Sequence, residues 1–488
     1  HIMHIVVIPS WYPSSETDVD GIFFRLQAQA LQCEGMKIGM VVPMFRYLRS
    51  QPKTIFSRFY GLRRHQQGGL NTYAYDSMYF FPRCPVVDID RIRWVNAGMK
   101  AFEAYIADNG KPDVIHAHCV NYAAILACAI FKKYGIPYVI TEHSSAISRG
   151  LVRKNQWPSM HEAVRHSAAR FAVSRDFCRI LEKTYAGTDW QYLPNMLGGN
   201  FEQDFEFPEK NHQDFTFCSV SHLRHLKGHD LLLPAFAEAL KTYPQLKLKI
   251  GGGGAEEGRL KQLASDLGIN HAVTFTGALT TDQTLDLMRH SNAFVLASRT
   301  ETFGVVYIEA LSQGLPVIAT RCGGPESIVT SDNGLLVPIE NIPELTKALL
   351  ILYENHAHYD PVRLRQDCLQ QFGSRAIAQH LIDTFRSNTG RKRAACAMRM
   401  RRWETFAVQL DGFVWRKQPV GAIFALAVGK MTAFNHHIFH APILKNFGGA
   451  FRILAVFNID TRQGLRFGQI GRQDVRMRQQ QAFHGFDG

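Results

Sequence analysis

Short apolar runs alternate with helix-patterned segments along the chain, and this alternation constrains the fold more than any other feature. In the first half, apolar runs occupy residues 5–8, 114–115 and 138–141, and helical spacing occurs at 24–33 and 122–134. Buried strands that alternate with helices are typical of a parallel sheet covered on both faces. The first half is therefore predicted to be an α/β domain.

The same pattern starts again after a polar stretch that carries Pro194-Asn195 and Gly198-Gly199. Helices are predicted at 229–240 and 258–267. Strands are predicted at 215–220, 246–250, 273–275, 293–296 and 316–319, with a short edge strand at 335–338. Two such units predict two Rossmann-like domains that face a central cleft, where open α/β sheets bind their ligands.

These patterns set the predicted boundaries. The first domain spans 1–193, a linker 194–213 and the second domain 214–360. A helical region at 361–389 follows, which we expect to cross back to the first domain. Residues 390–488 form a basic tail with sixteen Lys or Arg against five Asp or Glu, so it holds +11 of the net charge of +13. Its composition favours a disordered, solvated tail over a segment that binds nucleic acid or anionic lipid.

Composition narrows the class of protein. No apolar run reaches the ~18 residues that a membrane-spanning helix needs. The nine cysteines include no CxxC pair, which favours reduced thiols over a disulfide framework or a zinc site. The first residues, HIMHIVVIPSWYP, lack the layout of a signal peptide. We therefore expect a cytoplasmic protein.

Residues 298–326, SRTETFGVVYIEALSQGLPVIATRCGGPE, carry the strongest functional signal. A strand is predicted to end near Ala297 and a helix to begin near Val305. The unbonded amides at the start of that helix, those of Thr302, Phe303, Gly304 and Val305, predict a site for a diphosphate. Gly304 allows the backbone to approach the ligand closely.

Two acidic residues flank this helix start. Glu301, in the turn, is placed to accept hydrogen bonds from sugar hydroxyls, and Glu309, one turn into the helix, from a ribose. The alternative for Glu309 is that it merely complements the helix dipole.

Glu-x7-Glu enclosing Phe-Gly, followed by GLPVIAT and CGGPES, resembles the signature of the family 4 glycosyltransferases. The resemblance extends over about residues 5–385. It implies the GT-B fold, an acceptor-binding first domain, a second domain that binds a nucleotide sugar, and retention of anomeric configuration.

The resemblance also assigns roles to single residues. In SHLRHLKG, residues 221–228, Lys227 matches the lysine that contacts the donor phosphate. His222 replaces the family's arginine, and a neutral imidazole gives neither a permanent charge nor a bidentate fork. Either His222 acts protonated, or Arg224 substitutes for the arginine, or the reaction relies more on Lys227.

Further positions follow in family order. Gly21 matches an early glycine loop that faces the donor phosphate, and His143 a histidine that contacts the donor sugar. Gly277 and Leu279 match the loop that holds the nucleotide base. The glycine run 251–254 is interpreted as turn-forming rather than phosphate-binding. The predicted catalytic residues are Glu301, Lys227 and His143.

Three other functions fit parts of the sequence. His116, His118 and His143 suggest a metal-dependent hydrolase, although no motif such as HExxH accompanies them. The DxD triplets at 18–20 and 88–90 suggest a single-domain, metal-dependent glycosyltransferase. A non-catalytic module that binds nucleotide sugars would use the same cleft.

The prediction is a retaining glycosyltransferase that moves a hexose or amino sugar from a UDP- or GDP-linked donor, with neither metal nor cofactor. Its acceptor is a glycan or a lipid-linked glycan of bacterial polysaccharide or lipopolysaccharide synthesis. Residues 45–65 interleave six cations with aromatic and aliphatic side chains. They predict peripheral contact with the anionic inner face of the cell membrane, or else a solvated basic helix. No nucleic-acid partner is expected.

Overall fold

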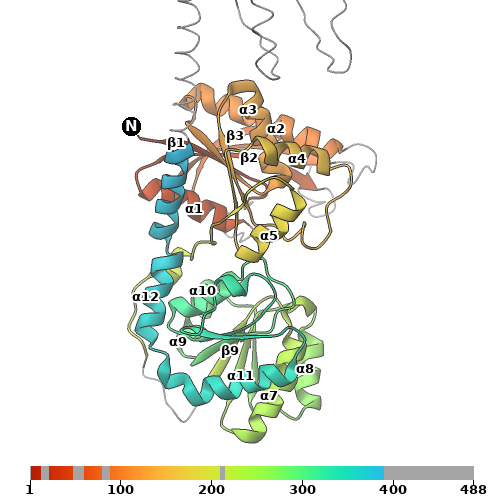
Figure 1. Ribbon diagram of the computed structural model, residues 1–488, viewed down its shortest axis with the longest axis vertical. Coiled ribbons are helices and arrows are strands. Elements are labelled where there is room, and N and C mark those ends of the chain that lie inside the picture. Colours follow the sequence, from red (N-terminus) through yellow and green to blue (C-terminus); the bar gives the residue numbers. More distant parts are fainter. Residues whose placement is uncertain (1, 13–20, 48–59, 80–87, 209–214, 389–488) are drawn as a thin grey trace, which may run out of the picture. The chain divides into compact units, whose positions relative to one another are not determined.

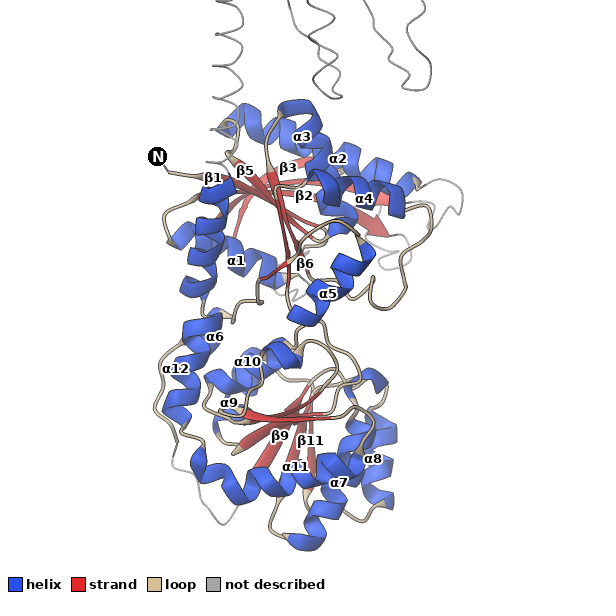
Figure 2. Ribbon diagram, in the orientation of Figure 1, coloured by secondary structure: helices blue, strands red, loops and turns tan. Residues whose placement is uncertain are grey.

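The computed structural model describes residues 2–12, 21–47, 60–79, 88–208 and 215–388. Within them lie two β-sheets, each with helices on both faces (Figures 1 and 2). Lobe 1 denotes the described residues up to 193, and lobe 2 those from 215 to 360. The tail at 390–488 lies outside the described residues.

The sheet of lobe 1 has the strand order β3-β4-β2-β1-β5-β6-β7-β8, and every neighbouring pair is parallel except β3 and β4. Its strands are β1 (His4–Pro9), β2 (Lys37–Tyr47), β3 (Gly61–Gln67), β4 (Leu70–Tyr79), β5 (Val114–His118), β6 (Tyr138–Glu142), β7 (Ala169–Ala172) and β8 (Gln191–Tyr192). Its main helices are α1 (Ile22–Cys33), α2 (Ile89–Asn109), α3 (Ile125–Tyr134), α4 (Trp157–His166) and α5 (Arg175–Thr184).

Alternate residues of β1 face opposite sides of this sheet, as the two-residue period of a strand requires. Val6 and Ile8 belong to one hydrophobic cluster, together with Phe102 of α2. Ile5 and Val7 belong to another, which holds α1 residues. Helices that bury both faces explain why β1 is a continuous apolar run in the sequence.

The sheet of lobe 2 is parallel throughout, in the order β11-β10-β9-β12-β13-β14. Its strands are β9 (Thr216–Val220), β10 (Lys247–Gly251), β11 (Val273–Gly277), β12 (Ala293–Leu296), β13 (Val317–Thr320) and β14 (Gly334–Val337). Its helices are α7 (His229–Thr242), α8 (Glu257–Asp266), α9 (Thr281–Arg289), α10 (Val305–Ser312) and α11 (Ile342–Asn355). Numbered within the lobe, this is the order 3-2-1-4-5-6 of the doubly wound nucleotide-binding fold.

The strand order of lobe 2 reverses direction between β9 and β12, which pair directly. Ligands of such sheets bind at the carboxyl ends of the strands, at this switch point. The loops that follow β9 and β12 begin at residues 221 and 297, and they carry Lys227 and Glu301. The topology therefore brings Lys227 and Glu301 together although they are 74 positions apart in the sequence.

The predicted linker contains a short helix, α6 (Gly199–Glu202), which the composition did not indicate. Arg365 of α12 (Pro361–Phe372) holds its end in place. The guanidinium donates to the carbonyls of Phe201, Ser312, Glu202 and Gln203. This one buried cation thus joins the linker, the carboxyl end of α10 and α12.

The last helical region is divided at Gly373 into α12 and a second helix at 374–388. Side chains of the second helix, including Ile377, Leu381 and Phe385, share a hydrophobic cluster with Ile5 and Val7 of lobe 1.

The basic segment at 45–65 is not a helix where the structure describes it. Residues 45–47 end β2 and residues 61–65 belong to β3, while 48–59 lie outside the described residues. β3 and β4 form a hairpin around Gly68-Gly69. Arg63 pairs with the buried carboxylate of Asp76, and Arg64 with Asp108 at 2.9 Å. The helical interpretation of this segment was therefore wrong at its described ends.

Candidate functional site

Lys227 and Glu301 form an ion pair at the switch point of lobe 2. The Lys227 Nζ donates to Glu301 Oε1 at 2.6 Å, and the side chains are 27% and 12% exposed. Lys227 ends a short 3-10 turn, residues His225–Lys227, just before α7. Opposite charges this close, and shielded from most water, attract more strongly than an exposed pair.

The position of Glu301 is set from two sides. Its carboxylate also accepts from Ser298 Oγ at 2.8 Å. Its backbone bridges to Gly323, and its carbonyl accepts from the Gly324 amide at 2.8 Å. The sequence CGG of the motif therefore braces the turn that carries Glu301.

The amino terminus of α10 lies directly after this turn. Gly304 caps the helix with φ of 94°, in the left-handed region that glycine adopts without strain. Within the described chain, the amides of Thr302, Phe303, Gly304 and Val305 donate no backbone hydrogen bond outside the helix. These four amides thus have no backbone acceptor among the described residues, and the diphosphate site at this helix start stays a prediction.

Phe303 contributes to this site only through its backbone. Its side chain is buried, and its ring centroid lies 6.1 Å from that of Phe372. The buried Tyr307 ring would contact a Cβ at Gly304 at 2.6 Å, and its hydroxyl donates to the Leu296 carbonyl at 3.1 Å. Tyr307 thus holds α10 against β12, and Phe303 packs the turn before α10 against α12.

Glu309 is partly accessible, and no side-chain hydrogen bond or ion pair to its carboxylate is present among the described residues. Burial raises its pKa to about 7. α10 starts at Val305, so Glu309 lies beyond the first turn of the helix. Stabilisation by the helix dipole falls off within the first turn. The alternative that Glu309 merely complements the helix dipole therefore does not explain this residue.

Arg299 anchors the Lys227 loop, a role that the sequence analysis missed. Its guanidinium donates to both oxygens of Asp230, at 2.8 and 3.0 Å, and also pairs with Glu340. It donates further to the His225 carbonyl at 2.5 Å, and its own amide donates to the Leu226 carbonyl at 2.8 Å. A bidentate arginine of this kind fixes the loop geometry. Its place between Ser298 and Glu301 in the motif was the available signal.

His222 and Arg224 are both exposed, and neither side chain forms a hydrogen bond or ion pair within the described chain. Arg224 donates only through its amide, to the His222 carbonyl at 2.8 Å. Both side chains are therefore accessible from solvent, and the three ways of replacing the family's arginine stay open.

The glycine run 251–254 allows two loops to pack backbone against backbone. A Cβ at Gly252 would lie 1.8 Å from the Ser221 carbonyl oxygen, and one at Gly254 2.4 Å from that of Leu223. The Gly252 amide donates to the Gly277 carbonyl at 2.8 Å. Leu279, two residues further on, packs against Gly251. The loops after β9, β10 and β11 thus support one another.

In lobe 1, Gly21 caps α1 with φ of 77° and lies against the Trp11 ring. His143 is 9% exposed and uses both ring nitrogens: Nδ1 lies 2.9 Å from Asn195 Oδ1, and Nε2 lies 3.0 Å from His118 Nδ1. Burial lowers its pKa to about 4. His143 is therefore a neutral imidazole held in a chain of hydrogen bonds.

The three histidines of the hydrolase alternative do not converge on a common point. His118 and His143 bond to each other, whereas His116 Nε2 lies 2.8 Å from Thr141 Oγ1. Burial lowers the pKa of all three. Among the residues that the structure describes, no three His, Cys, Asp or Glu side chains are arranged to hold a metal ion.

The DxD triplet at 88–90 has a structural role. Asp88 caps α2, where its carboxylate accepts from the Arg91 amide at 3.4 Å and from Arg153 Nη2 at 3.2 Å. Asp90 is buried in the first turn of the same helix. The other triplet, at 18–20, lies outside the described residues.

Two Rossmann-type sheets, with a lysine, a glutamate and a helix amino terminus at the switch point of the second, define the GT-B class of glycosyltransferases. Two family models match: "Glycosyltransferase Family 4" over residues 54–196 and "Glycosyl transferases group 1" over residues 200–368. The chain belongs to this glycosyltransferase family.

Curated relatives show the same kinship. An uncharacterized glycosyltransferase of Haemophilus influenzae is 38% identical over 146 residues, which are 30% of this chain and 41% of that protein. A D-inositol 3-phosphate glycosyltransferase of Corynebacterium jeikeium is 38% identical over 126 residues, 24% of this chain and 30% of the relative. The chain thus spans less than half the length of these two. The putative teichuronic acid biosynthesis glycosyltransferase TuaC of Bacillus subtilis is 26% identical over 74% of this chain and 91% of its own.

Solved structures share the fold. Sucrose-phosphate synthase from Thermosynechococcus elongatus aligns with a TM-score of 0.60 and 20% identity, over 79% of this chain and 98% of that one. HepE of Anabaena, in complex with UDP and glucose, aligns with a TM-score of 0.57 and 17% identity, over 79% and 100% of the two chains. The predicted GT-B fold is confirmed.

Proposed function

We propose that this protein is a retaining glycosyltransferase that moves a hexose or amino sugar from a UDP- or GDP-linked donor to a glycan or lipid-linked acceptor. The observation that supports this most is the arrangement at the switch point of lobe 2. An ammonium group, a carboxylate and a set of unbonded helix amides meet there, with Lys227 Nζ 2.6 Å from Glu301 Oε1. Diphosphate and sugar hydroxyls require these two opposite kinds of group side by side.

In this proposal the site residues have separate tasks. Lys227 and the amides of 302–305 stabilise the charge that develops on the leaving diphosphate. Glu301 orients the donor sugar, and Glu309 binds the ribose. His143 contacts the donor sugar from lobe 1, and Gly21 opens a loop that faces the donor phosphate. His222, Gly277 and Leu279 complete the donor site.

The chemistry then needs no general base from the protein. The bond between the anomeric carbon and the diphosphate oxygen breaks, and the bond to the acceptor oxygen forms on the same face of the sugar. The acceptor's proton passes to the leaving phosphate oxygen. The protein supplies position and electrostatic stabilisation, and we propose that it does so without a metal ion.

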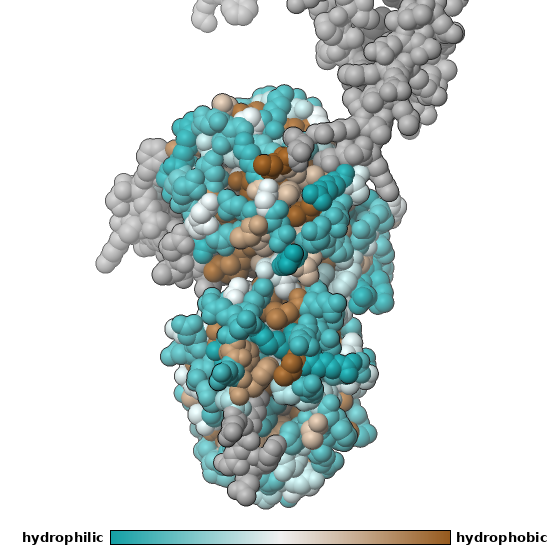
Figure 3. Space-filling model, turned by 90° about the vertical axis from the view of Figure 1, so that its left-hand side faces the viewer, coloured by the Kyte–Doolittle hydropathy of each residue, from teal (hydrophilic) through white to brown (hydrophobic). Residues whose placement is uncertain are grey.

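The proposed setting is bacterial polysaccharide or lipopolysaccharide synthesis on the cytoplasmic face of the membrane. It is supported by the likeness to TuaC, and lipid acceptors by 27% identity over 240 residues to an alpha-monoglucosyldiacylglycerol synthase of Streptococcus pneumoniae. No helix in the described residues has the length and apolarity to cross a membrane. On the face drawn in Figure 3, hydrophobic residues stand in small groups among hydrophilic ones.

Peripheral membrane contact through 45–65 is part of the proposal. Arg63 and Arg64, near the end of this segment, pair with Asp76 and Asp108. Arg64 also lies over the Tyr73 ring. Membrane contact would therefore depend on the other cations. Flotation with liposomes that contain or lack anionic lipid tests it. Equal recovery with both kinds of liposome would rule out this surface.

A donor screen tests the enzyme itself. Purified protein is incubated with UDP- and GDP-linked hexoses and amino sugars and with a mixture of glycan and lipid-linked acceptors, each with and without a chelator, and released nucleoside diphosphate is measured. We expect turnover of at least one donor, undiminished by the chelator. Donor binding without any turnover would favour the non-catalytic module, and loss of activity with the chelator would contradict the metal-independent mechanism.

A further inference from the structure

Three polar side chains form a chain of hydrogen bonds that joins the start of the linker to the interior of lobe 1. Asn195 Oδ1 lies 2.9 Å from His143 Nδ1, and His143 Nε2 lies 3.0 Å from His118 Nδ1. His118 ends β5, His143 follows β6 and Asn195 follows β8. The chain therefore runs along the carboxyl edge of the lobe 1 sheet, and its middle member is the residue expected to contact the donor sugar.

The asparagine at one end of this chain fixes the direction in which the hydrogens point. A carboxamide oxygen only accepts, so His143 Nδ1 carries a hydrogen and donates to Asn195 Oδ1. In a neutral imidazole the other ring nitrogen is then an acceptor. His143 Nε2 therefore accepts from His118 Nδ1, which leaves His118 Nε2 as an acceptor.

The far end of the chain favours the same direction. His118 Nε2 is buried and has no hydrogen-bond partner among the described residues. In the direction given above it is an acceptor without a partner, and in the reverse direction it would be an N–H without one. Buried donors without a partner are the rarer of the two in native proteins. Burial also lowers the pKa of both His118 and His143, which keeps the two rings neutral.

The contact with His118 opposes a second proton on His143. A protonated His143 would direct an N–H from Nε2 at the N–H of His118 Nδ1, which lies 3.0 Å away. The clash is avoided only if His118 moves its hydrogen to Nε2, where no described acceptor is present. Both arrangements cost free energy in a buried site, so the chain itself favours the neutral ring.

Aromatic side chains of α1 fix the planes of the two imidazoles. The ring centroid of the buried Phe24 lies 4.6 Å from that of His118 and 5.3 Å from that of His143. The Phe23 centroid lies 5.2 Å from that of His143. Because α1 begins directly after Gly21, the helix behind the predicted donor-phosphate loop packs against the His143 ring.

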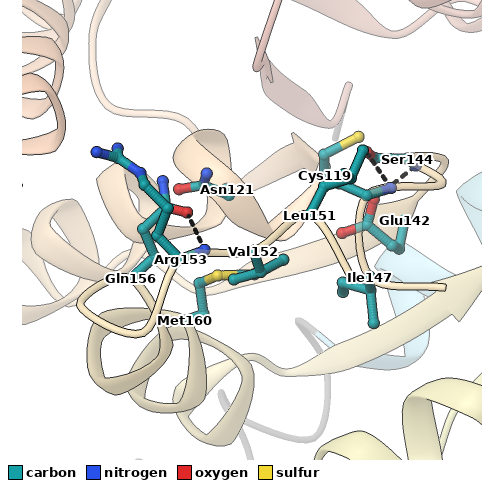
Figure 4. A pocket seen from close by; sticks show the side chains of 11 residues that line it. Cys119, Asn121, Glu142, Ser144, Ile147, Leu151, Val152, Arg153, Gln156 and Met160 are labelled. Carbon is teal, nitrogen blue, oxygen red and sulfur yellow. Dashed lines mark hydrogen bonds between the residues drawn. The ribbon is translucent and has the colours of Figure 1, made fainter. Parts of the chain in front are cut away.

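The backbone of His143 is fixed separately from its ring. Glu142 Oε1 accepts from the amides of His143 and Ser144 at 3.0 and 2.8 Å, and Oε2 accepts from the Val120 amide at 2.8 Å. Figure 4 shows Glu142 and Ser144 close together in the wall of a lobe 1 cavity. Loss of the Asn195 contact should therefore release the ring of His143 and leave its backbone in place.

We infer that Asn195 is a positioning residue, which together with His118 holds His143 as the neutral Nδ1–H tautomer in one ring orientation. The inference rests on the proposed transferase. In that reaction, positive charge develops at the anomeric carbon as the bond to the diphosphate breaks. A neutral imidazole beside the donor sugar does not oppose this charge, whereas an imidazolium would repel it.

The tautomer is tested on the full chain without any turnover. Long-range ¹H–¹⁵N correlation spectra of protein labelled with ¹⁵N-histidine distinguish protonated from unprotonated ring nitrogens. The signals that disappear in His143→Gln assign the ring. We expect wild-type His143 to carry its hydrogen on Nδ1 at pH 8. A hydrogen on Nε2, or an even mixture of the two tautomers, would overturn the inference.

Three variants show whether Asn195 sets this tautomer. Asn195→Ala should give a mixture of tautomers, whereas Asn195→Asp should keep the Nδ1–H form, because a carboxylate also only accepts. Asn200→Ala is the matched control, at an exposed position of the same linker, and its spectrum should equal that of wild type. An unchanged tautomer in Asn195→Ala would show that Asn195 does not set it.

Kinetics with a donor that is turned over test the positioning role. Asn195→Ala should lower kcat about 10- to 100-fold, with donor KM within about threefold of wild type, because a misplaced group near the reacting atoms slows the chemical step. Asn195→Asp should recover part of this loss, and Asn200→Ala should have wild-type kinetics. Asn195 is half-buried, so the melting temperature of Asn195→Ala should stay close to that of wild type.

The outcomes separate this role from a structural one and from the proposed function. A lower melting temperature and weaker UDP binding in Asn195→Ala, with kcat unchanged, would show a structural asparagine and overturn the inference. Wild-type kcat in spite of a mixed tautomer would also overturn it, and would leave the transferase standing. If the wild-type protein turned over no donor, the proposed transferase would fail, while the spectra would still decide whether Asn195 sets the tautomer of His143.

Discussion

Lys227 and Glu301 neutralise each other at the switch point of lobe 2, with 2.6 Å between Nζ and Oε1. The pair is internal to one lobe, since both residues follow strands of the same sheet. In the proposed mechanism, a donor places its diphosphate against Lys227 and its sugar against Glu301. Each of the two residues then either contacts the donor in addition to its ion-pair partner or exchanges that partner for the donor. In that mechanism, the ion pair holds the phosphate-binding lysine and the sugar-binding glutamate one hydrogen-bond length apart before the donor binds.

Replacement of Lys227 should mainly slow the chemical step. We expect Lys227→Ala to lower turnover roughly 10²–10³-fold, the loss typical of one transition-state stabiliser. Steady-state kinetics with the donor found in the screen provides the measurement. Lys241→Ala is the matched control, because Lys241 is exposed and, among the described residues, pairs only with Glu238 of its own helix. A loss of tenfold or less at Lys227 would mean that another group stabilises the diphosphate.

Glu309 should make stability depend on pH. Its pKa of about 7 lies above the value of ~4.3 for an unfolded glutamate. The folded state therefore holds more protons between about pH 4 and 7, and the free energy of unfolding falls as the pH rises through that window. Glu309→Gln removes this slope and should be more stable than wild type at pH 8 by roughly 1–3 kcal/mol.

Urea denaturation of both proteins from pH 4 to 8 tests this prediction. If the free energy of unfolding changed with pH equally in wild type and in Glu309→Gln, the Glu309 carboxylate would be well solvated and the prediction wrong. The ribose role predicts, in the same variant, a donor KM about tenfold higher, from the loss of a charged hydrogen-bond acceptor.

Arg299 should act as a positioning residue. Arg299→Met leaves Asp230 without its bidentate partner and should lower the free energy of unfolding by roughly 2–3 kcal/mol. It should also lower kcat more than it raises donor KM, because it frees the loop that positions Lys227. Arg259→Met is the control: Arg259 is 54% exposed and lies 4.0 Å from the same carboxylate, so the change should stay below about 0.5 kcal/mol. Equal effects of the two substitutions would contradict this role.

Gly228 should tolerate no side chain. It caps α7 with φ of 69°, and a Cβ there would lie 1.8 Å from the Ala297 carbonyl oxygen. Gly228→Ala should lower the free energy of unfolding by roughly 3 kcal/mol or more, through backbone strain and overpacking. Gly258→Ala, in α8 with nothing within 4 Å of the added carbon, should leave stability unchanged or raise it by up to about 1 kcal/mol. Thermal unfolding of both variants provides the comparison.

The sequence predicted the layered sheets because buried parallel strands are continuous apolar runs. The run predicted at 293–296 coincides with β12, and the predicted edge strand at 335–338 overlaps β14 at the edge of its sheet. The hairpin of β3 and β4 was missed, because β3 carries Arg63, Arg64 and further polar residues on a partly exposed edge. Only Gly68-Gly69 marked its turn.

The motif placed the parts of the donor site in the sequence, but contacts that join distant segments could not be seen there. Lys227 and Glu301 are 74 positions apart in the sequence, and strand pairing brings them together. In lobe 1, His143 after β6 lies within hydrogen-bonding distance of Asn195, 52 residues further along the chain, and no periodicity connects them. Burial was equally hidden: nothing in the spacing of His116, His118 and His143 showed that they bond to their neighbours rather than to a common ion.

The reversal of strand order between β9 and β12 has a consequence for how such a protein can diversify. Because Lys227 and Glu301 both follow strands of the lobe 2 sheet, substitutions in the lobe 1 sheet leave the ion pair itself unchanged. In the proposed transferase, the acceptor preference could therefore change through lobe 1 while the lysine–glutamate pair is kept.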